Sequence, residues 1–276
     1  MHEAVVSEQS RAFLRWAGGK TWLARQSEQI FGRLNFARYH EPFVGGGAFF
    51  FALPGTPHAY LSDKNEALIE VYQCLKDDHC KVISAMRGLK NTEEEYYRLR
   101  SLIPECRFDR AARFIYLNQT SFNGLYRVNL KGVYNVPYGH RTKNFLDEAA
   151  LVDAARALQN TVLSTRDFMD TLEFVGEGDL VFLDPPYTVS HNNNGFIKYN
   201  QSLFSIEDQY RLADFIREVR AKGAKYILTN AAHSKIREIF DLGDECFELS
   251  RASLIGGKKA QRGSVKELLF TNLGAL

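Results

Sequence analysis

Residues 38–63 constrain the fold of this chain most, because they predict a β-α-β unit. A strand-like run leads into three consecutive glycines, Gly45 to Gly47, and a helix is expected to begin at Ala48. A second strand ends in Asp63. In nucleotide-binding units, an acid about 20 residues beyond the glycine loop binds ribose hydroxyls. The G-x-G-x-x-G spacing is missing, so a nucleoside without phosphates fits better than NAD. A glycine-rich turn in an unrelated α/β fold is the alternative.

Helical and strand-like patterns alternate along most of the remaining chain. Helices are predicted at 21–34, 65–90, 91–103, 108–118, 147–158 and 233–241, with one more capped by Ser205, and strands at 161–165, 179–184, 225–230, 246–252 and 265–272. Residues 121–143 differ, because their Asn, Gly, Tyr and basic residues predict a loop with a small hairpin. We therefore expect a discontinuous α/β domain, residues 1–74 and 146–276, interrupted by a recognition insert at residues 75–145.

The tetrapeptide Asp184-Pro185-Pro186-Tyr187 lies at the end of the predicted strand 179–184. Its two prolines end regular structure, because each lacks an N–H and has a fixed φ. Open α/β sheets bind ligands at the carboxyl ends of their strands. A flat heterocycle with an exocyclic amine would suit this position, stacked on Tyr187, with its amine hydrogens bonded to the Asp184 carboxylate and the Pro185 carbonyl. A surface turn after a buried strand is the simpler interpretation.

Composition narrows the class of protein. The chain has 276 residues, 45% hydrophobic and 25% charged, which is typical of a globular protein. The net charge is only +2, but the charge is unevenly distributed. Residues 107–144 contain seven Lys/Arg and one acid, and residues 251–266 contain five Lys/Arg and no acid. Such basic segments indicate an anionic partner or, more simply, solvated faces. The four cysteines lack metal-ligand spacing, and no apolar stretch resembles a signal peptide or a membrane span, so we expect a cytosolic protein without a metal.

Five segments in this order resemble the Dam-type, D12 class DNA adenine-N6 methyltransferases. They are RWAGGK (15–20), EPFVGGG (41–47), LSDKN (61–65), FNGLYRVN (122–129) with NVPYG (135–139), and DPPY (184–187). The resemblance spans nearly the whole chain. It implies a Rossmann-like, S-adenosylmethionine-dependent methyltransferase sheet, an inserted and mainly helical target-recognition domain, and a C-terminal β-hairpin. Glu41 stands where many methyltransferases have Asp, and the three asparagines at 192–194 are unusual.

The resemblance also implies a cofactor site for S-adenosyl-L-methionine, with no metal. Trp16 and Lys20 would contact the methionine part, Asp63 the ribose, and Asp167 with Phe168 would bound the adenine. Asp184 would face both the cofactor's amino group and the target amine. The complete set of cofactor residues carried over is Trp16, Gly18, Lys20, Glu41, Pro42, Phe43, Gly45, Gly47, Asp63, Asp167, Phe168 and Asp184.

The implied reaction is methyl transfer to N6 of a flipped-out adenine in double-stranded DNA. The N6 lone pair is delocalised into the ring, so Asp184 and the Pro185 carbonyl would orient the amine and raise its electron density. Pro186 and Tyr187 complete the catalytic motif, and Tyr187 would stack on the flipped base. The methyl group is carried by a sulfonium, and the leaving group is a neutral thioether. The step therefore needs positioning more than acid–base catalysis. The loop at 188–202 could close over the flipped nucleotide.

The insert would read the target site, which the resemblance implies is GATC. Arg127 is the best candidate for a bidentate guanine contact. Lys258, Lys259 and Arg262 would bind phosphates without sequence preference. The remaining DNA contacts carried over are Arg15, Asn123, Leu125, Tyr126, Val136 and Pro137.

Two other functions stay open at this point. A cytosine-N4 methyltransferase would more often carry Ser in place of Asp184. A sequence-specific DNA-binding protein without catalysis is disfavoured because the set Trp16, Lys20, Asp63, Asp184 and Tyr187 is intact. The partners expected are double-stranded DNA and a cognate restriction endonuclease, with no membrane. The chain is expected to be a prokaryotic or phage-encoded monomer or weak dimer that associates with the nucleoid in the cytoplasm.

Overall fold

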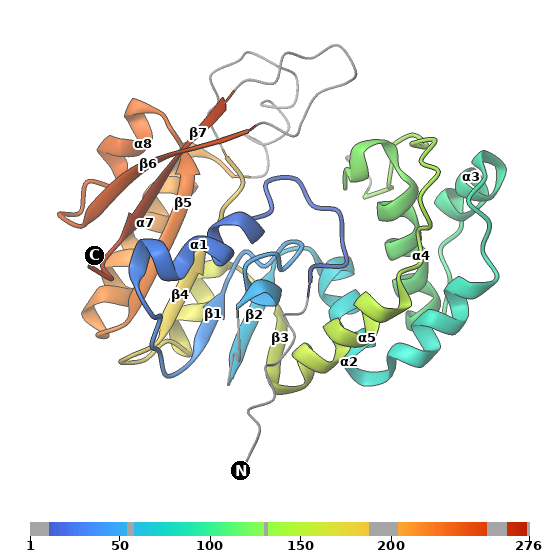
Figure 1. The fold of residues 1–276 in the computed structure, drawn as a ribbon, viewed down its shortest axis with the longest axis horizontal. Coiled ribbons are helices and arrows are strands. Elements are labelled where there is room, and N and C mark those ends of the chain that lie inside the picture. The colour runs from blue at the N-terminus through green and yellow to red at the C-terminus, as the bar shows by residue number, and fades with distance from the viewer. Residues whose placement is uncertain (1–10, 54–57, 130–131, 188–203, 253–263, 275–276) are drawn as a thin grey trace. The chain divides into compact units, whose positions relative to one another are not determined.

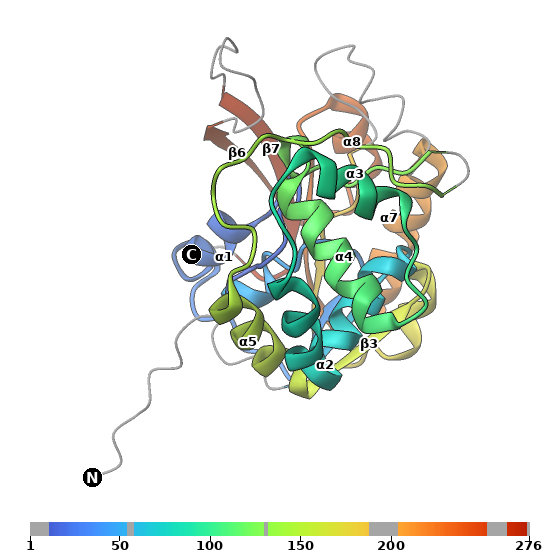
Figure 2. The ribbon, with the colours of Figure 1, turned by 90° about the vertical axis from the view of Figure 1, so that its right-hand side faces the viewer.

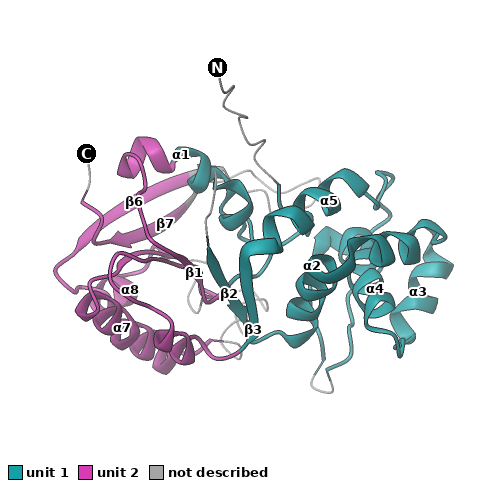
Figure 3. Cartoon of the chain, turned by 90° about the horizontal axis from the view of Figure 1, so that it is seen from below, with its two compact units in different colours: residues 1–26, 44–165 teal, residues 27–43, 166–276 magenta. Residues whose placement is uncertain are grey.

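The computed structural model describes residues 11–53, 58–129, 132–187, 204–252 and 264–274. The chain forms two compact units, coloured separately in Figure 3. Unit 1 comprises residues 1–26 and 44–165, and unit 2 comprises residues 27–43 and 166–276. The chain passes from unit 1 to unit 2 within helix α1 (Thr21–Phe31). Each unit is therefore built from stretches that are distant in sequence.

Unit 1 combines two parallel strands with a group of helices. Strands β2 (Ala59–Asp63) and β3 (Thr161–Thr165) pair in parallel along their whole length. Helix α2 packs against α4 and α5, and α3 packs against α4 (Figure 2). The helices are α2 (Glu66–Arg87), α3 (Glu93–Ser101), α4 (Arg107–Thr120) and α5 (Glu148–Ala157), with 3-10 turns η1 (Phe50–Ala52), η2 (Phe122–Gly124) and η3 (Leu158–Asn160).

Local sequence accounts for how these helices begin. Asn65, Thr92 and Asp147 each accept a hydrogen bond from a backbone N–H in the first turn of the helix that follows, as N-cap residues do. The helix expected from Ala48 is instead the single turn η1. Leu53 is already extended, with ψ at 132°, because the proline that follows it in the sequence disfavours helical backbone at the preceding residue.

Unit 2 contributes five of the seven described strands to the sheet. Strand β1 (Tyr39–Glu41) pairs in parallel with β4 (Leu180–Leu183), and β4 pairs in parallel with β5 (Lys225–Ala231). Beyond β5, the antiparallel strands β7 (Ser264–Thr271) and β6 (Glu245–Ala252) form the expected C-terminal hairpin (Figure 1). The described part of this unit also contains the helices α7 (Ile206–Ala221) and α8 (Ser234–Ile239) and the 3-10 segment η4 (Phe168–Glu173).

The topology confirms the predicted α/β fold. The strand order is β3-β2-β1-β4-β5-β7-β6, which gives a mostly parallel sheet consistent with a Rossmann-like methyltransferase. The order reverses between β1 and β4, both of which belong to unit 2. In open α/β sheets this is the point where ligands bind, beyond the carboxyl ends of the strands. Here those ends are Glu41 and Leu183, so Pro42 and Asp184 begin the two loops at the switch point.

The middle of the chain follows the sequence pattern. Two helices and a small hairpin occupy most of residues 93–138, with isolated β-bridges joining Ser121 to Tyr138 and Val128 to Tyr134. The predicted domain boundaries, 1–74 with 146–276 and 75–145, stay a prediction. Within the described part of the chain, no helix is long and apolar enough to cross a membrane.

A buried carboxylate lies at the amino end of β4. Asp179 is 0% exposed and accepts hydrogen bonds from Arg38 at 3.0 and 2.8 Å and from the Gly176 N–H at 2.9 Å, and His40 Nε2 lies 2.9 Å away. Burial alone would raise the pKa of Asp179, but the bonds from Arg38, Gly176 and His40 outweigh it and hold the pKa below its ordinary value. The ionised form of Asp179 therefore stabilises unit 2.

We predict that Asp179→Ala lowers the free energy of unfolding by about 3–5 kcal/mol, because it removes the carboxylate that compensates Arg38 and His40. The contribution of Asp179 should be fully present above its ordinary pKa and should disappear as pH falls through its lowered folded-state pKa. Urea unfolding at several pH values measures both effects. Asp214→Ala is the control, since the exposed Asp214–Arg217 pair should contribute less than about 1 kcal/mol. Equal losses in the two variants would contradict the role of Asp179.

Candidate active site

In unit 2, Asp184 directly follows β4 at the switch point. Its Oδ1 accepts a hydrogen bond of 2.7 Å from the hydroxyl of Thr229, which lies on β5 and is 1% exposed. The bond comes from a rigid neighbouring strand, so it fixes the orientation of the carboxylate. Pro185 is buried, while Pro186 and Tyr187 are partly exposed. The predicted catalytic motif therefore begins with an oriented carboxylate at the carboxyl end of a central strand.

The end of β1 supplies a second group of predicted residues. Glu41 is 2% exposed, and its carboxylate accepts a hydrogen bond of 2.8 Å from the Tyr39 hydroxyl. Burial, and next the Glu41 charge, raise the pKa of Tyr39 well above its ordinary value, so the phenol stays a donor. Phe43 is partly buried, with its ring 5.2 Å from that of Phe168 and 5.6 Å from that of Phe204. Pro42, which lies between Glu41 and Phe43 in the sequence, is buried.

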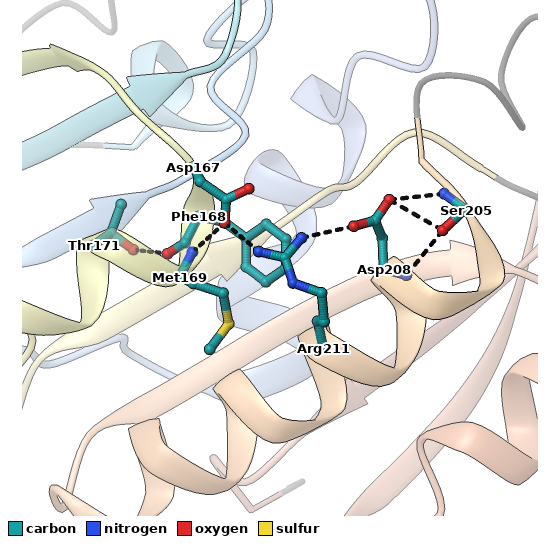
Figure 4. Close-up of polar contacts among 7 residues, drawn as sticks. All are labelled: Asp167, Phe168, Met169, Thr171, Ser205, Asp208 and Arg211. Carbon is teal, nitrogen blue, oxygen red and sulfur yellow. Dashed lines mark hydrogen bonds and ion pairs between the residues drawn. The ribbon is translucent and has the colours of Figure 1, made fainter.

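Asp167 and Phe168, predicted to bound the cofactor adenine, open η4 in unit 2 (Figure 4). Asp167 Oδ1 accepts one bond from the Met169 N–H and another from Arg211 Nη2, both at 2.9 Å. The Phe168 ring is 1% exposed, and the Arg211 guanidinium carbon lies 5.0 Å from its centre. Arg211 also donates to Asp208 at 2.7 Å. One guanidinium thus bridges two carboxylates above an aromatic ring.

In unit 1, Asp63 joins the glycine loop to the end of β2. Its Oδ2 accepts a bond from the Gly45 N–H and its Oδ1 a bond from the Asn65 N–H, each 3.0 Å. Burial raises the pKa of Asp63, against the opposing effect of the Asn65 and Gly45 N–H groups. The Tyr72 hydroxyl donates to the Gly45 carbonyl at 2.6 Å. The loop is therefore anchored at both polar groups of Gly45.

The glycines of this loop make room for aromatic side chains of the protein itself. A Cβ at Gly45 would lie 2.7 Å from Trp16 Nε1, and one at Gly46 would lie 2.6 Å from Trp16 Cβ. A Cβ at Gly47 would lie 2.7 Å from Phe51. In the Cβ direction of these glycines, the close neighbours are therefore side chains of the protein and not open space. Gly45 and Gly47 also have positive φ values, which favour glycine.

Residues 15–20 are joined to the turn after α4, also within unit 1. The buried Asn118 side chain accepts a bond from the Arg15 N–H at 2.8 Å and donates to the carbonyls of Arg15 at 2.8 Å and Gly124 at 3.2 Å. The Trp16 ring stacks on Tyr126 with centroids 5.7 Å apart, and Tyr126 stacks in turn on Phe114 at 5.0 Å. The segment predicted to contact the cofactor is thus built onto the turn predicted to contact DNA.

Two cationic residues of residues 15–20 have internal partners. The Arg15 guanidinium donates to the carbonyls of Gln119 at 3.3 Å and Ser121 at 3.2 Å, near the end of α4. Burial, and then the charge of Arg141, lower the pKa of Arg15. Lys20 is 2% exposed and donates to the carbonyl of Gly18, which has a φ of +83°.

The predicted base-reading residues differ in exposure. Asn123 is exposed with a φ of +55°, and Arg127 is exposed, with its Nε donating to Asn135 Oδ1 at 2.8 Å across the hairpin. Leu125 and Tyr126 pack against the core of unit 1. Val136 is 1% exposed within that core, so only Pro137 of the predicted apolar pair is exposed at the surface.

Some predicted features lie outside the described residues. These are the phosphate-binding residues Lys258, Lys259 and Arg262 and the loop at 188–202. Among the residues that are described, no three His, Cys, Asp or Glu side chains form a group that could hold a metal ion.

Sequence reasoning missed three residues that hold predicted site residues, Thr229, Arg211 and Asn118, and it did not single out the exposed Phe122. Phe122 is 49% exposed at the start of the Asn123-Gly124 turn, and an aromatic residue beside an N-G pair in a basic segment was a usable signal. Asn118, Thr229 and Arg211 lie in regular elements whose pattern gives no hint of their partners.

We predict that Gly124→Ala destabilises the protein more than Gly132→Ala. Both glycines have positive φ, +65° and +73°, so alanine should cost about 1–2 kcal/mol at either position. At Gly124 the new Cβ would also lie 2.4 Å from Arg15 Cβ. Among the described residues, a Cβ added at Gly132 would have no neighbouring atom within 4 Å. Overpacking should therefore add about 1–3 kcal/mol at Gly124. Thermal or urea unfolding of the two variants measures the difference, and equal destabilisation would rule out the close approach.

Comparisons with known proteins agree with this arrangement. The model of the D12 class N6 adenine-specific DNA methyltransferase family matches residues 16–251. A type II methyltransferase of Lactococcus lactis subsp. cremoris, M1.LlaDCHI, is 33% identical over 276 residues, with 96% of each chain covered. A DNA adenine methylase of Salmonella typhi is 31% identical, with 95% of each chain covered. The DNA N-6-adenine-methyltransferase of Escherichia phage P1 is 36% identical over 96% of this chain and 36% of its own length.

The family match covers strands β1 to β5, the glycine loop and the Asp184-Pro185-Pro186-Tyr187 motif. The cytosine-N4 and non-catalytic alternatives have no support among these relatives. The chain belongs to the D12 class of N6 adenine-specific DNA methyltransferases.

Proposed function

We propose that this enzyme methylates the adenine of GATC in double-stranded DNA, with S-adenosyl-L-methionine as methyl donor and Asp184 as the residue that orients the adenine amine. The family supports adenine N6 as the acceptor and a methyl donor of this kind. The observation that carries the site assignment is the position of Asp184. It follows β4 where the strand order reverses, and one of its oxygens is fixed by Thr229.

The residues present suit S-adenosylmethionine, whose sulfonium supplies the methyl group. Asp63 has both oxygens oriented by backbone N–H groups, which suits two vicinal ribose hydroxyls. Asp167 is an acceptor for the adenine amine, and the partly exposed Phe43 supplies an apolar surface. We assign Trp16, Gly18, Lys20 and the loop Gly45 to Gly47 to the methionine part. No side chain in this set needs to act as a nucleophile.

In the proposed mechanism the protein supplies orientation. The Asp184 carboxylate accepts one amine hydrogen and the Pro185 carbonyl accepts the other, which directs the N6 lone pair at the methyl group. Tyr187 stacks on the flipped base. Thr229 acts through Asp184 by keeping its carboxylate in one orientation. An Asp184→Ala enzyme should fold and should transfer no methyl group, because it lacks the principal acceptor for the amine.

For DNA, we assign base reading to the turn and hairpin after α4. Arg127, held by Asn135, has the exposure needed for a bidentate guanine contact, and Asn123 and Pro137 of the same segment are also exposed. Exposed Phe122 suits stacking against a base step. Arg15 lies near Arg141, and a phosphate beside this like-charged pair would relieve their repulsion. Leu125 and Tyr126 support the turn from within. Lys258, Lys259 and Arg262 remain proposed phosphate contacts.

Expression in a host that lacks adenine methylation, followed by modification-sensitive sequencing, tests the proposal. Complete N6 methylation at GATC is the expected result. Methylation at another motif would overturn GATC alone, whereas methylation of cytosine or none at all would overturn the assigned chemistry. We also propose that the enzyme acts as a monomer or weak dimer in the cytoplasm, where the DNA of a prokaryotic cell lies. A cognate endonuclease is the proposed partner, and it would cut the same motif in unmethylated DNA.

We predict that Thr229→Val lowers kcat about tenfold with little change in the KM for cofactor. Valine keeps the shape of threonine but removes the hydroxyl that orients Asp184, and a hydrogen bond to a charged group is worth about 1.5–3 kcal/mol. Thr229→Ser should restore most of the rate. Steady-state methylation of an oligonucleotide duplex gives both constants. A valine variant as fast as the wild type, or a serine variant as slow as valine, would exclude this positioning role.

We predict that Arg127→Ala loses about 1–3 kcal/mol of discrimination at one base pair of the target. Its guanidinium would read a base edge, so non-specific binding should change far less. Arg156→Ala is the matched control, because Arg156 is an exposed arginine on α5 whose pair with Asp153 is local. Competition binding with single-base variants of the duplex measures the effect. A uniform loss across all duplexes would show that Arg127 contributes charge only.

A further inference from the structure

We propose that Arg211 is a positioning residue that makes the cofactor pocket selective for adenine over a base with a carbonyl at the same carbon. The inference deepens the proposed function and rests on it, because it requires Asp167 to accept a hydrogen bond from the cofactor's adenine amine. Arg211 belongs to none of the sequence motifs, and it lies on α7, 44 residues from Asp167.

Two donors converge on one oxygen of the Asp167 carboxylate. The Met169 N–H and Arg211 Nη2 each lie 2.9 Å from Oδ1 (Figure 4). The first bond is local and caps η4, while the second comes from a separate helix. Two donors from different directions restrict the rotation of the carboxylate more than the backbone bond does alone.

Arg211 is itself fixed on three sides. Its Nη1 donates to Asp208 Oδ1 at 2.7 Å, and its guanidinium lies 5.0 Å from the centre of the buried Phe168 ring. Asp208 cannot rotate easily, since its Oδ2 accepts the Ser205 N–H at 3.0 Å in a capping box at the start of α7. The bonds to Asp208, with that to Asp167, raise the pKa of Arg211 and maintain its charge. A planar, forked cation suits this bridge in a way that lysine does not.

The chemistry of selection follows from this geometry. An ionised carboxylate only accepts hydrogen bonds. The amine of adenine donates to it, but the carbonyl of hypoxanthine at the same carbon is an acceptor, so the two oxygens would repel. If the carboxylate can rotate away from the base, it loses both its attraction to the adenine amine and its repulsion of the hypoxanthine carbonyl. Arg211 therefore determines how strongly Asp167 distinguishes the two bases, although it need not touch the base itself.

The test compares S-adenosylhomocysteine with S-inosylhomocysteine, in which a carbonyl replaces the adenine amine. Calorimetric Kd values are measured for the wild type, Arg211→Ala and Arg217→Ala. Arg217 is the matched control, an exposed arginine on the same helix whose pair with Asp214 is local. We expect the wild type and Arg217→Ala to prefer the adenine compound by at least about tenfold. In Arg211→Ala, affinity for the adenine compound should fall about tenfold, while affinity for the inosine compound stays within twofold.

The outcomes separate this inference from the proposed function. A wild type that binds neither compound, or binds both equally, would refute the cofactor assignment on which the inference depends. Wild-type preference retained by Arg211→Ala would overturn the inference alone. An equal loss for both compounds would also overturn it, because that pattern indicates only a structural role. Thermal unfolding checks that the variants fold, and if Arg211→Ala does not, Arg211→Lys should show the same selective loss at about threefold or more.

Discussion

The buried carboxylate of Asp179 is the interaction on which the arrangement of unit 2 depends. Strand β1 has only three residues, and its ladder with β4 is too short to define a register firmly. Asp179 adds bonds from Arg38 and contact with His40, which places residue 179 beside the start of β1. Because the register is fixed at this end, the other ends of β1 and β4 are fixed too. Glu41 and Asp184 therefore begin their loops at the same edge of the sheet.

The two units use different physical means to hold the residues of the proposed site. In unit 2, charged and polar side chains orient carboxylates, as Thr229 does for Asp184 and Arg211 for Asp167. In unit 1, close packing dominates, because the glycine loop lies against Trp16 and Trp16 stacks on Tyr126. Substitutions at Thr229 and Arg211 should therefore change rate and specificity, whereas substitutions at the glycine loop should first change stability.

The proposed cofactor and DNA residues of unit 1 share a common support. The Asn118 side chain bonds to Arg15 and to Gly124, so the segment that contains Trp16 and the turn that contains Asn123 cannot move independently without breaking those bonds. Gly124 must be glycine for Arg15 to approach so closely. If the turn moved when it contacted DNA, the bonds of Asn118 would therefore transmit the movement to the segment that contains Trp16. The same contacts explain why a buried asparagine persists inside an otherwise apolar helix face.

The sequence by itself determined the element order, the family motifs and the local caps, such as Ser205 with Asp208, because these depend on spacing over a few residues. Only the tertiary structure decided the partners of the motif residues. Thr229 reaches Asp184 across 45 residues, Arg211 reaches Asp167 across 44, and Asn118 reaches Arg15 across 103. Packing also buried Val136, which the motif alone placed at the DNA. Periodicity tells which face of an element is apolar, but which side chains meet depends on how distant elements pack.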